Sequence, residues 1–367
     1  MLALVFLVLA GVHSSPSVLQ QFKVFSQKSE GYETFRIPGL VQTSNGTLLA
    51  FAEGRVAIDR PAVGNASVCY GSPASKHDSS CVDKDIVYKR SYDAGATWTA
   101  TVVLTEANAT YFYSNPNAAV DPRTGRVYLL YARCAVSKVY GDCVDVVRES
   151  NNDGETFGDP RFYEDLPLGI GGPGGGWVVR RAMGKPWQGR VLFPKHGKNT
   201  AFLYSDNEGV DWKAGLTLES FGENEIAETS NGSLVMAIRS GYAPAFLRSD
   251  DGGAKWYRPD VMTSLVNPNC QVSLTSFLTK SNVYLLLSHP NTNVEPQPLG
   301  RQNMTVHYSA DMGTTWSVLA QIYEGSSAYS SVIQINETTA ACLYERSESP
   351  PPINFESMYI AFIPFAR

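Results

Sequence analysis

The stretch SYDAGATW at residues 91–98 returns as SADMGTTW at residues 309–316, so both copies follow the pattern Ser-x-Asp-x-Gly-x-Thr-Trp. Looser copies read SNNDGETF at residues 150–157, SDNEGVDW at residues 205–212 and SDDGGAKW at residues 249–256. Each copy follows a short apolar run, which is typical of a β-strand that leads into a turn. In such a turn an Asp or Asn accepts hydrogen bonds from backbone NH groups, while the Gly takes a positive φ. We therefore expect these repeats to build turns rather than to carry chemistry.

The period of the repeats predicts the architecture. A strand–turn–strand unit that recurs every ~50–60 residues, with few helical stretches between copies, is typical of a β-propeller built from four-stranded blades. The predicted fold class is all-β, a six-bladed β-propeller that spans residues 16–367 as one domain. Because the blades of a propeller surround a central axis, we expect the residues of a functional pocket to come from several blades.

Composition and charge narrow the class of protein. The chain has 367 residues, 43% of them hydrophobic and 18% charged, so it can bury a sizeable core. A formal net charge of −5 argues against a general nucleic-acid binder, which needs a basic face to neutralise phosphates. Residues 1–15 combine an apolar run with small residues at their end, which predicts a signal peptide and a secreted or lysosomal protein. No later run approaches ~20 apolar residues, so no membrane span is expected beyond the signal peptide.

Sequons and cysteines agree with passage through a secretory pathway. Six Asn-x-Ser/Thr sequons predict a glycoprotein, and they begin at Asn45, Asn65, Asn108, Asn231, Asn303 and Asn336. None of the six cysteines shows the CxxC spacing of a zinc site, and an even number behind a signal peptide favours disulfides. The local pairs are Cys69–Cys81 and Cys134–Cys143. For Cys270 and Cys342 the sequence leaves a third disulfide and two buried thiols as open alternatives.

Three arginines occupy unusual places in the pattern. Arg36 lies between apolar residues in the motif Phe-Arg-Ile-Pro, where an unpaired buried charge would be costly. Arg239 ends the apolar run LVMAIR, and Arg301 precedes the run MTVHYS. Each arginine alone is typical of a structural ion pair. Together on one axis, the three guanidinium groups would form a multidentate clamp for a carboxylate.

The FRIP motif, the five repeats (known as Asp-boxes) and two later arginines in this order resemble the exo-α-sialidases of the six-bladed propeller fold. The resemblance covers the chain from about Phe35 to the C-terminus, and the combination is far more specific than either motif alone. It implies an enzyme, a retaining glycoside hydrolase without cofactor or metal. Its substrates would be the terminal sialic acid residues of glycoproteins, glycolipids or oligosaccharides.

The resemblance also implies which residues bind the substrate. Arg36, Arg239 and Arg301 match the triad that binds the carboxylate of sialic acid. Glu53 and Arg55, in the run AFAEGR, match residues that line the pocket around the N-acyl group. The segment GGPGGGW at residues 171–177 resembles the glycine-rich loop near the substrate.

A second group of residues matches the catalytic machinery. Tyr329 matches the nucleophile, Glu223 matches the glutamate that accepts the tyrosine proton, and Glu345 matches the carboxylate that orients the first arginine. A neutral phenol suits a substrate whose anomeric carbon already bears a carboxylate, since that charge would repel an Asp or Glu nucleophile. A phenol with a pKa near 10 is a poor nucleophile at neutral pH, so it needs a base beside it.

The acid/base aspartate is where this sequence departs from the family pattern. In the family it falls shortly after the strand that matches AFAEGR, but here an insertion over residues 58–85 separates that strand from the first repeat. The run HDSS, which contains Asp78, resembles the short polar loop that carries this aspartate in the family. Asp78 is therefore the preferred acid. Asp59 is the alternative, and Asp83 comes third. The residue that protonates the leaving group should be partly buried, because burial raises the pKa of a carboxyl group.

Two other functions remain compatible with this pattern. A catalytically inactive, sialic-acid-binding propeller (a lectin) would keep the fold, although binding alone would not require both Tyr329 and Glu223. A trans-sialidase, or an enzyme that prefers a deaminated sialic acid, would use the same residues. Transfer instead of hydrolysis depends on how the pocket excludes water and holds an acceptor. The oligomeric state and the linkage preference are likewise left open.

Overall fold

The computed structural model describes residues 19–56, 83–135, 143–166, 170–196, 202–216, 222–257, 265–292, 300–348, 355 and 357–366. Every regular element in these ranges is a β-strand, so the all-β prediction is confirmed. None of the described residues forms a helix that is long and apolar enough to cross a membrane. The predicted signal peptide lies outside the described residues.

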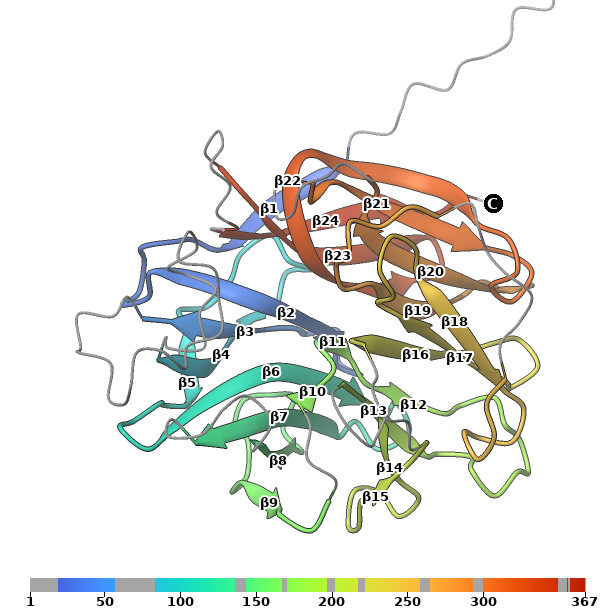
Figure 1. The fold of residues 1–367 in the computed structure, drawn as a ribbon, viewed down its shortest axis with the longest axis horizontal. Coiled ribbons are helices and arrows are strands. Elements are labelled where there is room, and N and C mark those ends of the chain that lie inside the picture. The colour runs from blue at the N-terminus through green and yellow to red at the C-terminus, as the bar shows by residue number, and fades with distance from the viewer. Residues whose placement is uncertain are drawn as a thin grey trace, which may run out of the picture.

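The strands form five hydrogen-bonded sheets within the described ranges, and Figure 1 shows these sheets following one another around the centre of the molecule. The first contains β2 (Thr34–Gln42), β3 (Leu48–Arg55), β4 (Lys84–Ser91) and β5 (Val102–Thr105). The second contains β11 (Gly174–Gly175), β6 (Tyr111–Val120), β7 (Val127–Ala135), β8 (Cys143–Ser150) and β9 (Arg161–Tyr163). The third contains β10 (Ile170–Gly171), β12 (Trp177–Val178), β13 (Val191–His196), β14 (Phe202–Ser205) and β15 (Lys213–Ala214).

The remaining two sheets complete the circuit. The fourth contains β16 (Asn224–Glu228), β17 (Leu234–Ile238) and β18 (Ala245–Ser249). The fifth has seven strands, namely β19 (Ser273–Leu278), β20 (Val283–Pro290), β21 (Gln302–Ser309), β22 (Ser317–Asn336), β23 (Thr339–Arg346), β24 (Ser357–Pro364) and β1 (Gln20–Phe25). One strand of each of the first four sheets and two strands of the fifth follow one another around the centre, and the contacts run from β2 to β6, β13, β16, β19, β22 and back to β2.

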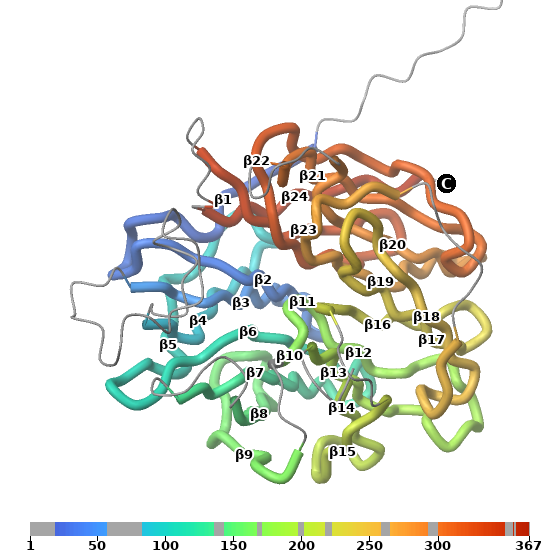
Figure 2. The backbone as a smooth tube through the Cα atoms, viewed as in Figure 1, coloured from blue at the N-terminus to red at the C-terminus, as the bar shows by residue number. Residues whose placement is uncertain are grey.

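The seven-stranded sheet owes its size to the 20 residues of β22. The half of β22 up to Ser326 pairs with β21, whereas the half from Ser327 onwards pairs with β23. The same sheet joins the two ends of the described chain, because Gln20 of β1 lies opposite Phe362 of β24. Figure 2 shows this closure as the blue first strand beside the red last strand.

The repeats build turns, as predicted. In the first copy, the Ser91 hydroxyl accepts a hydrogen bond from the backbone NH of Gly95 at 2.8 Å, and Asp93 Oδ1 accepts one from the NH of Thr97 at 2.9 Å. Gly95 has a φ of +88°, a conformation that favours glycine. The same serine-to-glycine bond recurs in the other four copies, at Ser150, Ser205, Ser249 and Ser309.

The aromatic residue that ends a repeat packs between neighbouring sheets. Phe157, from the turn after β8, contacts Tyr88 of the preceding sheet edge to face, with ring centroids 5.5 Å apart. Trp212, from the turn after β14, lies 5.3 Å from Phe193 and 6.3 Å from Tyr128 of the preceding sheet. Aromatic pairs at these distances stabilise the packing beyond simple burial. The repeats therefore hold each sheet against the one before it.

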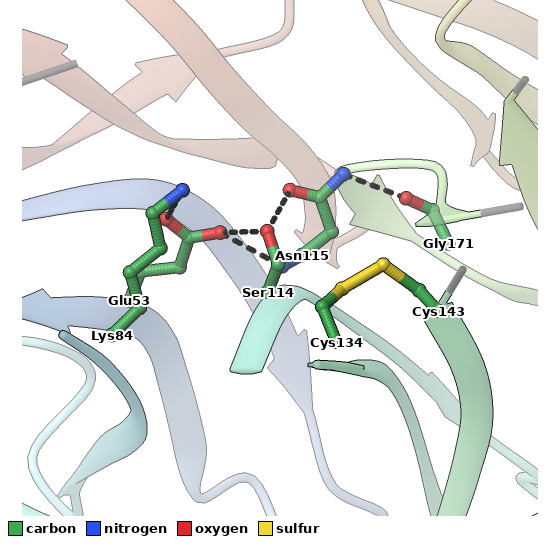
Figure 3. The surroundings of a disulfide bond; sticks show 7 residues. All are labelled: Glu53, Lys84, Ser114, Asn115, Cys134, Cys143 and Gly171. Carbon is green, nitrogen blue, oxygen red and sulfur yellow. Dashed lines mark hydrogen bonds and ion pairs between the residues drawn. A yellow bond between two sulfur atoms is a disulfide. The ribbon is translucent and has the colours of Figure 1, made fainter. Parts of the chain in front are cut away.

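The structure describes four of the six cysteines. Cys134 at the end of β7 and Cys143 at the start of β8 form the predicted disulfide, which Figure 3 shows beside β6. Cys270 and Cys342 are buried free thiols, which decides between the two alternatives that the sequence left open. The predicted Cys69–Cys81 pair lies outside the described residues.

Candidate active site

Six of the predicted site residues come from different strands and meet at one end of the axis. Most lie where an inner strand begins or its neighbour ends, so the strand directions bring them together although they are far apart in sequence. The six are Arg36 on β2, Glu223 just before β16, Arg239 just after β17, Arg301 just before β21, Tyr329 on β22 and Glu345 on β23.

At the centre of this cluster, Tyr329, Glu223 and Arg239 form a triangle. The Tyr329 hydroxyl donates to Glu223 Oε1 at 2.5 Å. Arg239 Nη1 donates to Glu223 Oε2 at 2.8 Å and to the Tyr329 oxygen at 3.1 Å. A carboxylate within hydrogen-bond reach of a phenol is placed to accept its proton, and a cation at the same oxygen stabilises the phenolate that would result.

The surroundings shift the pKa values of Glu223 and Tyr329 in opposite directions. Burial alone would raise the pKa of Glu223, but the charge of Arg239, the nearby His196 and the hydrogen bond from Tyr329 hold it below its ordinary value. Burial and the adjacent Glu223 carboxylate raise the pKa of Tyr329 well above that of a free phenol. In the resting site the proton therefore stays on Tyr329, while Glu223 is ionised and able to take it.

Glu345 connects the first arginine to the tyrosine. Its Oε1 accepts hydrogen bonds from Arg36 Nε and from the backbone NH of Ile37, both at 2.7 Å. Its Oε2 accepts one from the backbone NH of Tyr329 at 3.0 Å. Ile37 has a φ of +61°, which is costly for a β-branched residue and is held here by the bond to Glu345. The carboxylate thus positions Arg36, whose guanidinium carbon lies 5.6 Å from the centroid of the Tyr329 ring.

The third arginine faces the same ring and is held by a residue that the sequence reasoning missed. The Arg301 guanidinium carbon lies 5.9 Å from the Tyr329 centroid, and its Nη2 donates to the backbone oxygen of Asn269 at 3.1 Å. The Asn269 side chain in turn accepts a hydrogen bond from Arg239 Nε at 3.1 Å. Asn269 has a φ of +50°, so its backbone is in the left-handed region. The run NPNC is a recognisable turn signal, but nothing in it indicates contacts with two arginines.

Glu53 and Arg55 form a buried network rather than an open surface. Arg55 donates to Glu53 Oε2 through Nε at 2.9 Å and Nη2 at 2.6 Å, and both side chains are almost fully buried. Glu53 Oε1 accepts hydrogen bonds from the Ser114 hydroxyl and the Asn115 backbone, as Figure 3 shows. Burial would raise the pKa of Glu53, but the charges of Lys84 and Arg55 and these hydrogen bonds lower it to about 2. That this pair lines a pocket for the N-acyl group stays a prediction.

The glycine-rich segment crosses the axis against a second buried carboxylate, Glu225. Gly174 has a φ of +116°, and a Cβ there would lie 1.6 Å from Glu225 Oε1, so only glycine fits. The Glu225 oxygens accept four hydrogen bonds, from the NH groups of Gly175 (3.3 Å) and Leu274 (2.8 Å), the hydroxyl of Ser273 (2.9 Å) and the amide of Gln271 (3.2 Å). This carboxylate was not predicted, although it alternates with Glu223 in the run GENEIAE.

The acid/base candidates Asp78 and Asp59 lie outside the described residues and stay predictions. The third candidate, Asp83, is described immediately before β4, where its backbone oxygen accepts a hydrogen bond from the NH of Val56 at 3.1 Å. Within the described ranges, no group of three or more His, Cys, Asp or Glu side chains could hold a metal ion.

Comparison with known proteins identifies the family. Residues 76–342 match the model of the BNR repeat-like domain. A sialidase of Micromonospora viridifaciens is 26% identical over 91% of this chain, and the alignment spans 53% of that relative's own length.

Two solved structures share the fold. The Hadza microbial sialidase Hz136 superposes with a TM-score of 0.75 at 22% identity, over 94% of this chain and 68% of that one. The leech intramolecular trans-sialidase, in complex with 2,7-anhydro-Neu5Ac, superposes with a TM-score of 0.71 at 17% identity, over 92% and 68% of the two chains. The repeats and the all-β fold agree with these matches: the chain belongs to the family of the BNR repeat-like domain, and it is similar to sialidases that have this domain's fold.

Proposed function

We propose that the protein is an exo-α-sialidase that removes terminal sialic acid from glycoproteins, glycolipids or oligosaccharides by a retaining mechanism. The observation that carries the proposal is the triangle of Tyr329, Glu223 and Arg239, in which a buried phenol, an ionised carboxylate and a cation share hydrogen bonds. Binding alone would require no base beside a phenol.

The charges around Tyr329 favour an anionic substrate. Three guanidinium groups surround the ring of Tyr329, those of Arg36, Arg239 and Arg301. Among the described residues, Glu345 bonds to Arg36 and Glu223 bonds to Arg239. A substrate carboxylate would bring a further negative charge to the three arginines, and the planar guanidinium fork suits it. The clamp would place the anomeric carbon, which bears that carboxylate, close to the Tyr329 oxygen.

The chemical steps follow from this placement. Glu223 takes the Tyr329 proton as the phenolic oxygen bonds to the anomeric carbon, and the bond from that carbon to the leaving oxygen breaks. An aspartate donates a proton to the leaving oxygen, and we assign this role to Asp78, with Asp59 as the alternative. Water then replaces Tyr329 at the anomeric carbon, the aspartate takes the water proton, and Glu223 returns its proton to the phenolate. Two displacements at the same carbon give net retention.

The proposal includes six blades of four strands as the scaffold. The closed circuit of six inner strands, β2, β6, β13, β16, β19 and β22, supports this count. The change of partner between Ser326 and Ser327 supports a reading of the seven-stranded sheet as two blades that share β22. We also propose that the protein matures in an oxidising compartment and is secreted or lysosomal, which the Cys134–Cys143 disulfide supports.

The direct test is an assay of the purified protein on a fluorogenic sialoside and on the methyl ester of the same compound. We expect turnover of the free acid and inhibition by a transition-state analogue that bears a carboxylate. The ester should be inert, because it offers no anion to the three arginines. Binding of the acid without turnover would contradict the proposal and favour a lectin. Product analysis separates free sialic acid from transferred or anhydro products, the latter being the outcome for a trans-sialidase.

Substrates with different leaving groups can show which aspartate is the acid. An aryl sialoside with an acidic phenol barely needs protonation, whereas a sialyl-galactoside does. Asp78→Ala should therefore lose far more activity on the sialyl-galactoside than on the aryl sialoside. If Asp59→Ala shows this difference and Asp78→Ala does not, Asp59 is the acid.

A further inference from the structure

A cavity of about 500 Å³ opens at the end of the axis opposite the catalytic cluster. The inner strands β2, β6, β19 and β22 end at the cavity, and β2 runs towards it from Arg36 to Thr43, whereas β13 runs the opposite way. Seven residues of extended chain separate these two side chains, which corresponds to about 20 Å. Glu225 and two of its donors, Gly175 and Leu274, line the cavity, whereas none of the six residues of the catalytic cluster does. The cavity is therefore separate from the catalytic cluster.

Two arginine side chains line this cavity, those of Arg180 and Arg181. Arg180 and Arg181 use their backbone NH groups to bind the Glu228 carboxylate, at 2.8 and 2.6 Å. Within the described part of the chain, neither guanidinium group makes a hydrogen bond or an ion pair. Arg180 is exposed at the cavity, with its guanidinium carbon 5.1 Å from the centroid of the Trp177 ring.

Two further polar groups in the wall are also unsatisfied. The Thr43 side chain is 5% exposed, and its Oγ1 has no hydrogen-bond partner among the described residues. The indole Nε1 of Trp177 is likewise buried without a partner. Buried polar groups in folded proteins are normally hydrogen-bonded, so these two unpaired atoms, which belong to cavity-lining residues, leave capacity for a further polar partner.

The acidic groups near the cavity do not cancel the two arginines. Glu337 lies exposed at the rim, and the Glu228 carboxylate is bonded to the backbone of the arginines rather than to their side chains. Burial raises the pKa of Glu225 well above its ordinary value, which favours its neutral form. Glu228 and Asp121 act on the charge of Arg180 from a distance, but among the described residues neither pairs with the guanidinium group of either arginine, so both groups can bind a ligand in the cavity.

We propose that this cavity is a second, non-catalytic binding site for an acidic monosaccharide. Its acid group would pair with Arg180 and Arg181, since guanidinium groups bind carboxylate and phosphate oxygens in a bidentate manner. Its hydroxyl groups would pair with Thr43 and Trp177. The volume lies in the range of small-molecule sites, and the wall combines aliphatic side chains with hydroxyl, amide and indole groups, which suits the polar and apolar faces of a sugar ring.

Ligand-observed NMR titration of the full chain tests the proposal with glucuronate, glucose 6-phosphate and glucose. We expect the better of the two acids to bind with a Kd of about 1 mM, as ordinary ligand efficiency gives for a monosaccharide. The two acids distinguish a carboxylate from a phosphate ligand. Glucose should bind at least about tenfold more weakly, because it lacks the charge that pairs with arginine.

Three variants test whether the acidic sugar binds in this cavity. Arg180→Gln should weaken the acid about tenfold, and the near-isosteric Thr43→Val about threefold, as the loss of a charged and a neutral hydrogen bond implies. Arg161→Gln, an arginine on the outer strand β9, is the matched control and should bind as the wild type does. Sialoside turnover should stay unchanged in all three variants.

Several outcomes would overturn the proposal. They are no saturable binding of either acid, equal binding by the wild type and both cavity variants, and displacement of the acid by an inhibitor of the catalytic cluster. The first would mean that the cavity holds water only. If Arg180→Gln fails to fold, the result with Thr43→Val decides. Because the readout is binding at the far end of the axis, it is independent of whether the catalytic cluster turns over sialosides.

Discussion

Glu223 and Glu225 lie two residues apart and are both buried, yet their surroundings are opposite. Glu223 faces the cation of Arg239 and the hydroxyl of Tyr329. Glu225 has no cation bonded to it among the described residues and accepts only neutral donors from the glycine-rich segment and the region of β19. A strand places residues i and i+2 on the same side, so one backbone segment presents both carboxylates to the axis.

The hydrogen-bonding and charged partners of a buried carboxylate, and not its burial alone, therefore decide what chemistry it can perform. Burial raises the pKa of both groups, but Arg239, His196 and Tyr329 bring that of Glu223 below its ordinary value. Neutral donors do not achieve this for Glu225, whose pKa stays well above the ordinary value. Glu223 is thereby suited to accept a proton, whereas Glu225 is suited to join strands around the axis.

The largest expected effect comes from removing the hydroxyl of Tyr329, which donates a hydrogen bond to Glu223. Tyr329→Phe should lower kcat at least about 1,000-fold, because the proposed nucleophile is lost with almost no change in volume. The unfolding midpoint should change little. Tyr323→Phe, which removes a hydroxyl bonded to the Ser347 backbone outside the cluster, is the matched control and should keep its activity. Substantial turnover by Tyr329→Phe would remove the nucleophile assignment.

Two isosteric substitutions test whether Glu223 and Glu225 have these different roles. Glu223→Gln should lower kcat by about 100-fold or more, since the base is lost. Glu225→Gln should leave kcat within a few-fold of wild type but lower the free energy of unfolding by about 1–3 kcal/mol, because the new amide NH₂ faces backbone and hydroxyl donors. Kinetics and denaturant unfolding on both variants separate the two roles. A large loss of kcat in Glu225→Gln with an active Glu223→Gln would reverse the assignment.

The pH dependence isolates the contribution of the cation. Because Arg239 lowers the pKa of Glu223, the base stays ionised into acid solution, and kcat/KM should fall only below the ordinary glutamate pKa. In Arg239→Gln the pKa of Glu223 rises, so the acid limb of the profile should move to higher pH. Arg239→Lys keeps the charge and should keep the limb near its wild-type place, although substrate binding weakens in both variants. An unmoved limb in Arg239→Gln would show that another group controls it.

The two carboxylates also illustrate which features of the molecule can be predicted from the sequence. The all-β fold follows from the repeats, because the serine, the Asp or Asn and the glycine of each turn form their hydrogen bonds, among the described residues, with residues a few positions away. The arginines, Tyr329, Glu223 and Glu345 were found through the resemblance of ordered motifs to a family. Glu225 was missed although it lies two residues from the predicted Glu223, since its role depends on Gly174, which is remote in sequence. That Gly174 needs to lack a side chain becomes evident only when the two segments meet.

The smallest effect concerns Asn269, which holds the cation that distinguishes Glu223 from Glu225. Asn269→Gly keeps the positive φ and the backbone oxygen that binds Arg301, but it removes the side-chain oxygen that binds Arg239. We expect KM for a sialoside to rise about threefold to tenfold with a smaller change in kcat, as the loss of one hydrogen bond to a charged group implies. Asn269→Asp retains both acceptor oxygens and should stay closer to wild type in KM. Equal values of KM for the glycine and aspartate variants would mean that the side chain does not position Arg239.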